Sequence, residues 1–147
     1  MIEFLRPVND KPVGYPIIAA NSEAFSVGDA VTIDGDGCLA KASTSSKIFG
    51  YAIEDYTAAA DNETVAKYCP MYVYARGIEI VIDADQACTQ TDIGAYADLG
   101  TVTTGVQVLN LAAGATGQFL VLGFLADDTD KVIVVAAERT EDAYAQS

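Results

Sequence analysis

Residues 27–43 read VGDAVTIDGDGCLAKAS, and this stretch decides the fold because it encodes two extended segments and the turn between them. Val31 and Ile33 fall on one face with a threonine between them, the period of two that is typical of a strand. The two Asp-Gly pairs of residues 34–37 supply the positive φ values that tight hairpin turns need. A second extended piece, residues 38–43, follows directly. The stretch therefore predicts a β-hairpin.

The same turn has a second interpretation, a calcium loop that begins with Asp34 and Asp36. Such a loop needs further oxygen ligands at alternate positions and a late glutamate. Here a cysteine and a leucine follow, and the next glutamate is Glu54. The acidic residues at 83–85 and 127–130 could also bind a cation. We interpret them instead as solvated turns in which aspartate bonds its own backbone. We predict no metal site and no cofactor.

Strand patterns continue through the rest of the chain. Residues 77–83, GIEIVID, place three isoleucines on one face, at positions 78, 80 and 82. Residues 65–75 are rich in Tyr and Val, and Pro70 among them indicates an edge strand or a bulge. Residues 131–138, KVIVVAAE, predict a fully buried final strand, and 83–91 at most a turn or two of helix. The fold class is all-β.

Two short elements occur twice in the same order. Residues 27–34 (VGDAVTID) are echoed by 93–100 (IGAYADLG), and 49–57 (FGYAIEDYT) by 122–129 (LGFLADDT). We interpret them as two hairpin modules of a single compact β-barrel or sandwich-like domain, each with a glycine where backbones pass closely.

The first 24 residues differ from the rest of the chain. Three of the four prolines, at positions 7, 12 and 16, prevent a helix there, yet the segment is too apolar to stay in water. We therefore expect an extended arm over 1–24, a β domain over 25–138 and a polar tail over 139–147. The arm is expected to contact another protein or an adjacent protomer through Ile2, Phe4, Leu5, Ile17 and Ile18.

Composition narrows the class of function. Of 147 residues, 51% are apolar and 20% charged, a low share of charge that suits a protein covering part of its surface against copies of itself or a larger body. The net charge of −13 and the scattered basic residues disfavour direct binding to nucleic acid and to anionic membranes. The absence of histidine excludes Ser-His-Asp and Cys-His catalysis, and we expect no enzyme.

The start of the chain and the cysteines indicate where the protein is made. Residues 1–10 lack the basic head and apolar run of a signal peptide, and no stretch reaches membrane-spanning length. Three cysteines without CxxC spacing predict neither a disulfide framework nor a zinc site. We expect synthesis in a host cytoplasm.

These motifs, taken together, resemble the small capsid decoration, or cement, proteins of tailed bacteriophages. In that family a segment G-D-x-V … G-x-x-x-K-A leads to a strand of the form hydrophobic-G-hydrophobic-A and then to x-G-hydrophobic. The pattern falls here on Gly28, Asp29, Val31, Gly37, Lys41, Ala42, Phe49, Gly50, Tyr51, Ala52, Arg76, Gly77 and Ile78. The resemblance covers residues 25–83 well and 92–138 loosely.

The resemblance implies a β-barrel-like structural protein on the outer surface of an expanded bacteriophage capsid, bound to the major capsid protein and to itself, commonly as a homotrimer. A head-fibre or tail-associated structural module is the principal alternative. A carboxylate-based hydrolase comes third, because the chain has no histidine.

Overall fold

Strands make up nearly all of the regular structure in the computed structural model, which describes residues 2–4, 13–100, 105–112 and 117–137. The all-β prediction is confirmed. The strands are β1 (Ile2–Phe4), β2 (Ala24–Phe25), β3 (Ala30–Ile33), β4 (Leu39–Lys41), β5 (Gly50–Ala52), β6 (Tyr56–Thr57), β7 (Tyr72–Tyr74), β8 (Glu79–Asp83), β9 (Tyr96–Leu99), β10 (Leu109–Asn110), β11 (Phe119–Leu125) and β12 (Asp128–Ala136). Two single turns of helix accompany them, α1 (Asn62–Val65) and the 3-10 turn η2 (Gln90–Asp92).

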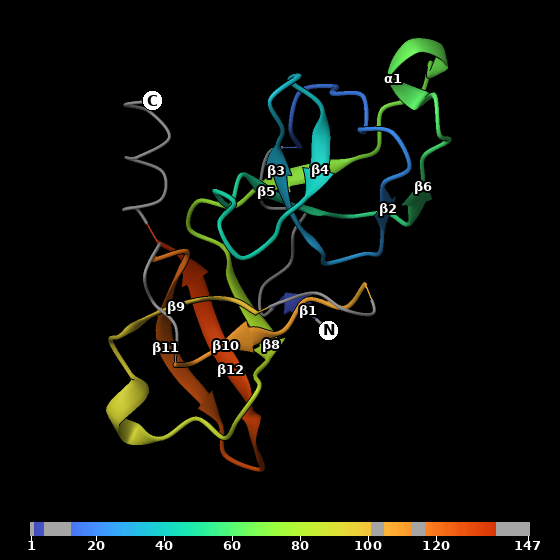
Figure 1. The fold of residues 1–147 in the computed structure, drawn as a ribbon. Coiled ribbons are helices and arrows are strands. Elements are labelled where there is room, and N and C mark those ends of the chain that lie inside the picture. The colour runs from blue at the N-terminus through green and yellow to red at the C-terminus, as the bar shows by residue number, and fades with distance from the viewer. Residues whose placement is uncertain (1, 5–12, 101–104, 113–116, 138–147) are drawn as a thin grey trace.

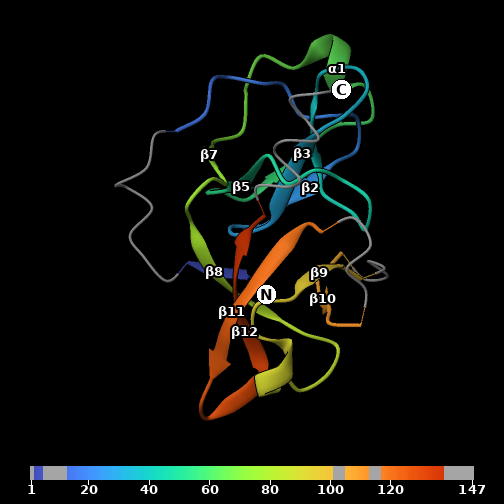
Figure 2. The same cartoon turned by 90° about the vertical axis from the view of Figure 1, so that its left-hand side faces the viewer.

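The strands form two lobes, one above the other in Figure 1. The first lobe, residues 13–75, contains a sheet in the order β4-β3-β5-β7 and the small pair β2-β6. The second lobe, residues 78–137, contains a sheet in the order β8-β12-β11-β9-β10, with β1 added next to β8. The view turned by 90° shows the same division (Figure 2).

The predicted hairpin is confirmed as β3 and β4, which pair antiparallel from Val31 with Lys41 to Ile33 with Leu39. Its turn is held by Asp34, whose carboxylate accepts the N–H groups of Asp36 and Cys38, each at 2.9 Å. The backbone N–H of Asp34 also donates to the carbonyl of Cys38 at 2.9 Å. Aspartate therefore builds this turn with its own side chain.

The first repeated element is confirmed by the hydrogen bonding. β3 lies between β4 and β5, as β9 lies between β10 and β11. The N–H of Gly28 donates to the carbonyl of Ala52 at 2.7 Å, and in the second lobe that of Gly94 donates to the carbonyl of Val121 at 2.8 Å. The two lobes are therefore two versions of one unit.

The strand pairing does not follow the second repeated element. The residue that takes the place of Gly50 in the second lobe lies four positions before Gly123. Val31 pairs with Gly50, whereas the equivalent Ala97 pairs with Phe119, so Gly123 is not the counterpart of Gly50. A Cβ atom at position 50 would lie 2.4 Å from the carbonyl oxygen of Val73 in β7, so a close backbone approach requires glycine there. At position 123 it would meet only a side-chain carbon 3.9 Å away. The expectation of a close approach at both glycines is wrong for the second.

The chain ahead of β2 closes the first lobe. Val13 forms a bridge with Val73 of β7 at one edge of the sheet. At the opposite edge, Leu39 of β4 donates to the carbonyl of Ile18 and accepts from the N–H of Ala20, both at 2.9 Å. Residues 13–20 thus link both edges of the sheet, and they are part of the lobe, which differs from the separate arm expected for residues 1–24.

In the second lobe, β8 has the corresponding position. It pairs with β12 along its length, and the next residue, Ala84, forms a parallel bridge with Leu109 of β10. The bridge between Ala19 and Leu39 in the first lobe is also parallel. Each lobe therefore closes on itself through an equivalent extended segment. The tail expected over 139–147 lies outside the described residues.

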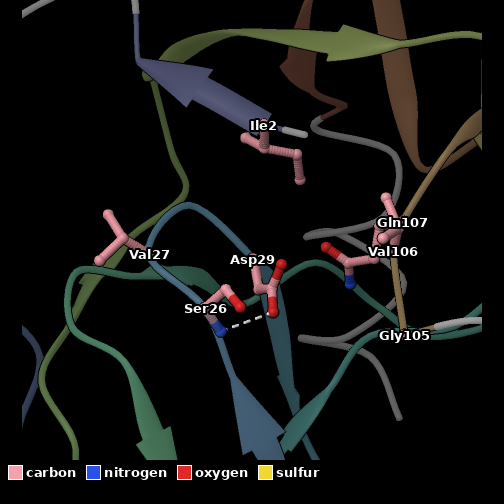
Figure 3. Close-up of a pocket in the computed structure, with 7 residues that line it drawn as sticks. All are labelled: Ile2, Ser26, Val27, Asp29, Gly105, Val106 and Gln107. Carbon is pink, nitrogen blue, oxygen red and sulfur yellow. Dashed lines mark hydrogen bonds between the residues drawn. The ribbon is translucent and has the colours of Figure 1, made fainter.

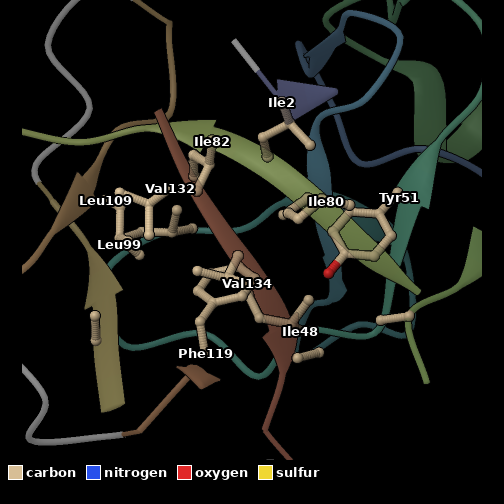
Figure 4. Packing of buried hydrophobic residues seen from close by; sticks show 14 of the residues in the cluster. Ile2, Ile48, Tyr51, Ile80, Ile82, Leu99, Leu109, Phe119, Val132 and Val134 are labelled. Atoms are coloured by element: carbon tan, nitrogen blue, oxygen red, sulfur yellow. The ribbon is translucent and has the colours of Figure 1, made fainter. Parts of the chain in front are cut away.

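One hydrophobic core runs through both lobes, so the two units form one compact domain. It joins Tyr51 and Val73 of the first lobe to Phe119 and Val134 of the second, as Figure 4 shows for several of these side chains. The three isoleucines of residues 77–83 all lie in this core, as predicted. A second cluster around Phe25 fills the first lobe alone.

The last strand, β12, is not buried on both faces. Val132, Val134 and Ala136 are buried, whereas the residues between them are half-buried. The prediction of a fully buried strand over 131–138 is wrong because β12 is covered by the core on only one side. The apolar residues at 133 and 135 made the run look continuous.

Two buried glutamine side chains of the second lobe bond to the backbone of the first. The Oε1 atom of Gln107 accepts the N–H of Ala30 at 2.7 Å, and its Nε2 donates to the carbonyls of Ala30 and Ala42 at 2.8 and 3.0 Å. The Nε2 of Gln118 donates to the carbonyl of Ser43 at 2.7 Å. Each amide supplies a donor and an acceptor as a strand backbone does.

Replacing Gly50 with alanine should destabilise the fold, since the new methyl group would press on the carbonyl of Val73. We expect the free energy of unfolding to fall by about 1–3 kcal/mol, the range for overpacking. Gly35→Ala is the control, because a Cβ there has nothing within 4 Å, and its effect should stay within about 0.5 kcal/mol. Urea denaturation measures both, and equal midpoints for the two variants would contradict the close approach at Gly50.

Gln107→Leu should weaken the contact between the lobes, because it leaves the buried N–H of Ala30 and the carbonyl of Ala42 without the partner that Gln107 supplies. The carbonyl of Ala30 keeps its bond from the N–H of Ala42. Each unpaired buried group costs about 1–3 kcal/mol. Gln86→Leu changes the same atoms at an exposed position and should leave the urea midpoint near the wild-type value. A Gln107 variant as stable as its control would show that the amide is dispensable.

Candidate interaction surface

An open groove of about 360 Å³ lies on the first lobe between residues 13–16 and 67–71. Its lining includes large apolar side chains that reach solvent, with Tyr15 79%, Tyr68 52% and Met71 44% exposed. Tyr15 is the most exposed large hydrophobic residue of the described chain. A cluster of this kind is typical of a contact site for another molecule.

Two prolines explain why the groove is open. In the second lobe, β8 and β12 pair at five successive positions. In the first lobe, the equivalent pairing consists of the Val13–Val73 bridge and one bond from the N–H of Gly14 to the carbonyl of Tyr72 at 2.8 Å. Pro16 and Pro70 stand beyond this point and have no amide hydrogen to continue the ladder. The sequence predicts an edge strand or a bulge over residues 65–75. The strand found there, β7, lies at the edge of its sheet and covers only residues 72–74.

One wall of the groove is fixed by Glu54. Its carboxylate accepts the hydroxyl of Tyr68 at 2.7 Å and the N–H of Met71 at 3.0 Å. The ring of Tyr68 stacks on Tyr56 with centroids 5.7 Å apart. The hydrogen bond to Glu54 raises the pKa of the Tyr68 hydroxyl. Side chains held in place in the free protein lose less conformational entropy when a partner binds.

A second, smaller cavity of about 170 Å³ lies where β1 passes over the first lobe (Figure 3). Ile2 covers one side, and the exposed Val27 and Val106 flank it. Its acidic group, Asp29, accepts the N–H of Ser26 at 2.8 Å and pairs with the Nζ atom of Lys41 at 3.1 Å. The carboxylate of Asp29 and the amide of Gln107, which also lines this cavity, are both bonded within the protein.

Asp34, Cys38 and Glu63 form the one cluster of metal-binding residue types found in the described chain, with ligand atoms within 4.8 Å of one another. Burial raises the pKa of the Cys38 thiol, and the charges of Glu63 and Asp34 raise it further. Glu63 also accepts the N–H of Asn21 at 3.0 Å. We interpret the cluster as hydrogen bonding around the hairpin turn.

Three of the other acidic residues singled out in the sequence have partners within the protein. Asp83 accepts a hydrogen bond from Lys131 at 2.8 Å, which lowers the pKa of its carboxyl group. Asp128 accepts the N–H of Asp130 at 3.2 Å, the local bonding expected for this turn, and Asp85 accepts the N–H of Leu111 at 3.3 Å.

The contact residues predicted from the sequence do not gather on one surface. Ile2 is 5% exposed and belongs to the shared core. Ile17 is half-buried against the second cluster, and Ile18 is half-buried at the edge of β4. The backbone of Phe4 pairs with β8, while its side chain and all of Leu5 lie outside the described residues.

Sequence reasoning misses the groove residues. Its patterns assign Tyr15 to an arm, and Tyr68 and Met71 to a half-buried strand. Pro16 and Pro70 could have indicated the groove, because neither can continue a strand ladder. That inference requires knowing that residues 13–16 and 67–71 face each other, which the sequence does not give.

Comparison with known proteins adds no relative: no family model, no curated protein and no solved structure matches the chain. None of the helices in the described residues is long and apolar enough to cross a membrane.

The hairpin turn should depend on Asp34 and be indifferent to metal. Asp34→Ala removes the acceptor of two backbone N–H groups and should cost about 1–3 kcal/mol, since one such bond contributes about 0.5–1.5 kcal/mol. Asp36→Ala is the matched control and should stay within about 0.5 kcal/mol. A melting temperature that falls in EDTA and recovers with calcium would instead reveal a bound ion.

Proposed function

We propose that this protein is a structural virion protein that binds the outer surface of an expanded bacteriophage capsid and stabilises it. The observation that carries the proposal is the sequence pattern shared with decoration proteins, whose residues from Gly28 to Ala52 fall on one continuous piece of the first lobe. Gly28 to Val31 enter β3, Lys41 ends β4, and Gly50 to Ala52 form β5. A pattern that follows three adjacent strands supports a shared fold better than one scattered over loops.

Several pattern residues have a structural task in this piece. Asp29 pairs with Lys41 at 3.1 Å across the hairpin, and both side chains are largely buried. Gly28 has a φ of 94°, and Gly50 admits the carbonyl of Val73. These roles give physical reasons for the residue types in the pattern, and they support a common architecture with that family.

The major capsid protein is the partner that we propose for the groove of the first lobe. Among the described residues, Lys67 is the only charged one that lines it, although the chain carries a net charge of −13. The described lining of the groove therefore adds no acidic side chain that would repel an acidic partner. Its exposed aromatic and apolar side chains are of the kind that dominate binding energy in protein interfaces. Self-association as a homotrimer completes the proposal.

Co-sedimentation with capsids tests this function. The protein should pellet with expanded heads and remain in solution with precursor shells. The double variant Tyr15→Ser with Met71→Ser should bind heads at least about tenfold more weakly, since about 1.4 kcal/mol of lost contact energy suffices. Val106→Ser with Leu122→Ser is the control, because it removes comparable exposed side chains outside the groove.

Each outcome has a distinct meaning. Failure of the wild-type protein to pellet with expanded heads would refute the proposed function. Binding of the groove variant with unchanged affinity would place the contact on another face. Immunolabelling of intact particles separates a capsid protein from the head-fibre or tail alternative, since the label then lies over the head surface or away from it.

A further inference from the structure

Strand β1 stands outside both repeated units. Residues 13–20 with β3, β4, β5 and β7 complete the first unit, and β8 to β12 complete the second. β1 adds to the free side of β8 through three antiparallel pairs, Ile2 with Ile82, Glu3 with Val81 and Phe4 with Ile80. It is an appended strand on an edge that the fold leaves open.

The site on the protein that β1 occupies is shaped to fit this strand. The side chain of Ile2 is buried beside Ile80 and Ile82 in the shared core (Figure 4). Its carbonyl lies against Gly28, where an added Cβ would come within 2.5 Å of the oxygen and where φ is 94°. A side chain at position 28 would therefore collide with the strand. The chain thus carries a built acceptor site for its own first strand.

The connection from β1 to the first lobe allows this strand to be shared. Residues 5–12, LRPVNDKP, join β1 to the first lobe. Eight extended residues reach at most about 26–29 Å. The acceptor edge is the same in every copy, so a strand that leaves its own β8 finds identical contacts on a neighbour.

We propose that β1 is exchanged between copies, so that Ile2–Phe4 of one chain pair with β8 of the next in the assembled protein. The occupant of the β8 edge is then a second copy of this chain, and each copy both gives and receives a strand. This inference deepens the self-association in the proposed function and rests on it. It also explains how an apolar N-terminal segment can be buried in its own domain and still link protomers.

A disulfide reporter distinguishes exchanged from unexchanged strands. Glu3→Cys with Val81→Cys places thiols on directly opposed residues of β1 and β8, in a background where Cys38, Cys69 and Cys88 are replaced by serine. The purified protein is oxidised at low and at high concentration and analysed on non-reducing gels. We expect an intrachain disulfide in dilute monomer and interchain disulfides in the oligomer. Thr32→Cys with Ala40→Cys, opposed within the hairpin, is the control that stays intrachain throughout.

Two results overturn the inference. One is an oligomer in which the engineered bridge between positions 3 and 81 remains intrachain, and the other is a protein that stays monomeric at every concentration. If the reporter variant does not fold, deletion of residues 2–4 takes its place. The truncated protein should keep its β circular dichroism and lose its oligomer in sedimentation velocity, and retention of the oligomer would also refute exchange.

Neither experiment uses capsids, so the two proposals fail separately. Interchain bridges in a protein that never binds heads would refute the proposed function alone. Binding to heads with only intrachain bridges would refute strand exchange alone.

Discussion

The amide of Gln107 is the interaction on which the arrangement of the two lobes depends. Closing a small sheet leaves backbone groups of β3 facing the other lobe, and buried groups of this kind are costly unless they are bonded. Gln107 accepts the N–H of Ala30 and donates to the carbonyls of Ala30 and Ala42. Gln118 bonds the loop after β4 in the same way, and Lys41 donates to the carbonyl of Gly105. With these bonds in place, the shared core fixes the lobes as one body.

The structure uses one five-segment unit twice, and the two copies differ in how their first segment pairs with the strand beside it. In the second lobe the seam between β8 and β12 is continuous, and β8 still has an edge to which β1 adds. In the first lobe Pro16 and Pro70 interrupt the equivalent seam and leave a groove. Both surfaces proposed for interactions thus arise where the two copies of the unit differ.

Local sequence patterns were enough to predict individual strands and turns. How those strands pair depends on residues far apart in the chain, which local patterns do not connect. The hairpin of residues 27–43 and the buried isoleucines of β8 follow from alternation and turn chemistry within a few residues. The place of residues 13–20 depends on Leu39 and Val73, which no local pattern connects to them. The groove was invisible for the same reason, because its two walls come from separate segments. Gly123 was aligned with Gly50 because two short elements have similar sequences, and such similarity does not give the register of strand pairing.

The shared core has a consequence for synthesis of the chain. The first lobe emerges from the ribosome first, yet its buried Ala30 and Ala42 bond to Gln107, and its Tyr51 and Val73 pack on strands that come later. A domain of mainly non-local pairings folds slowly, and unpaired strand edges are prone to aggregation while it does so. During translation the first half therefore cannot complete its folding, and part of its apolar surface stays exposed until nearly the whole chain has been synthesised.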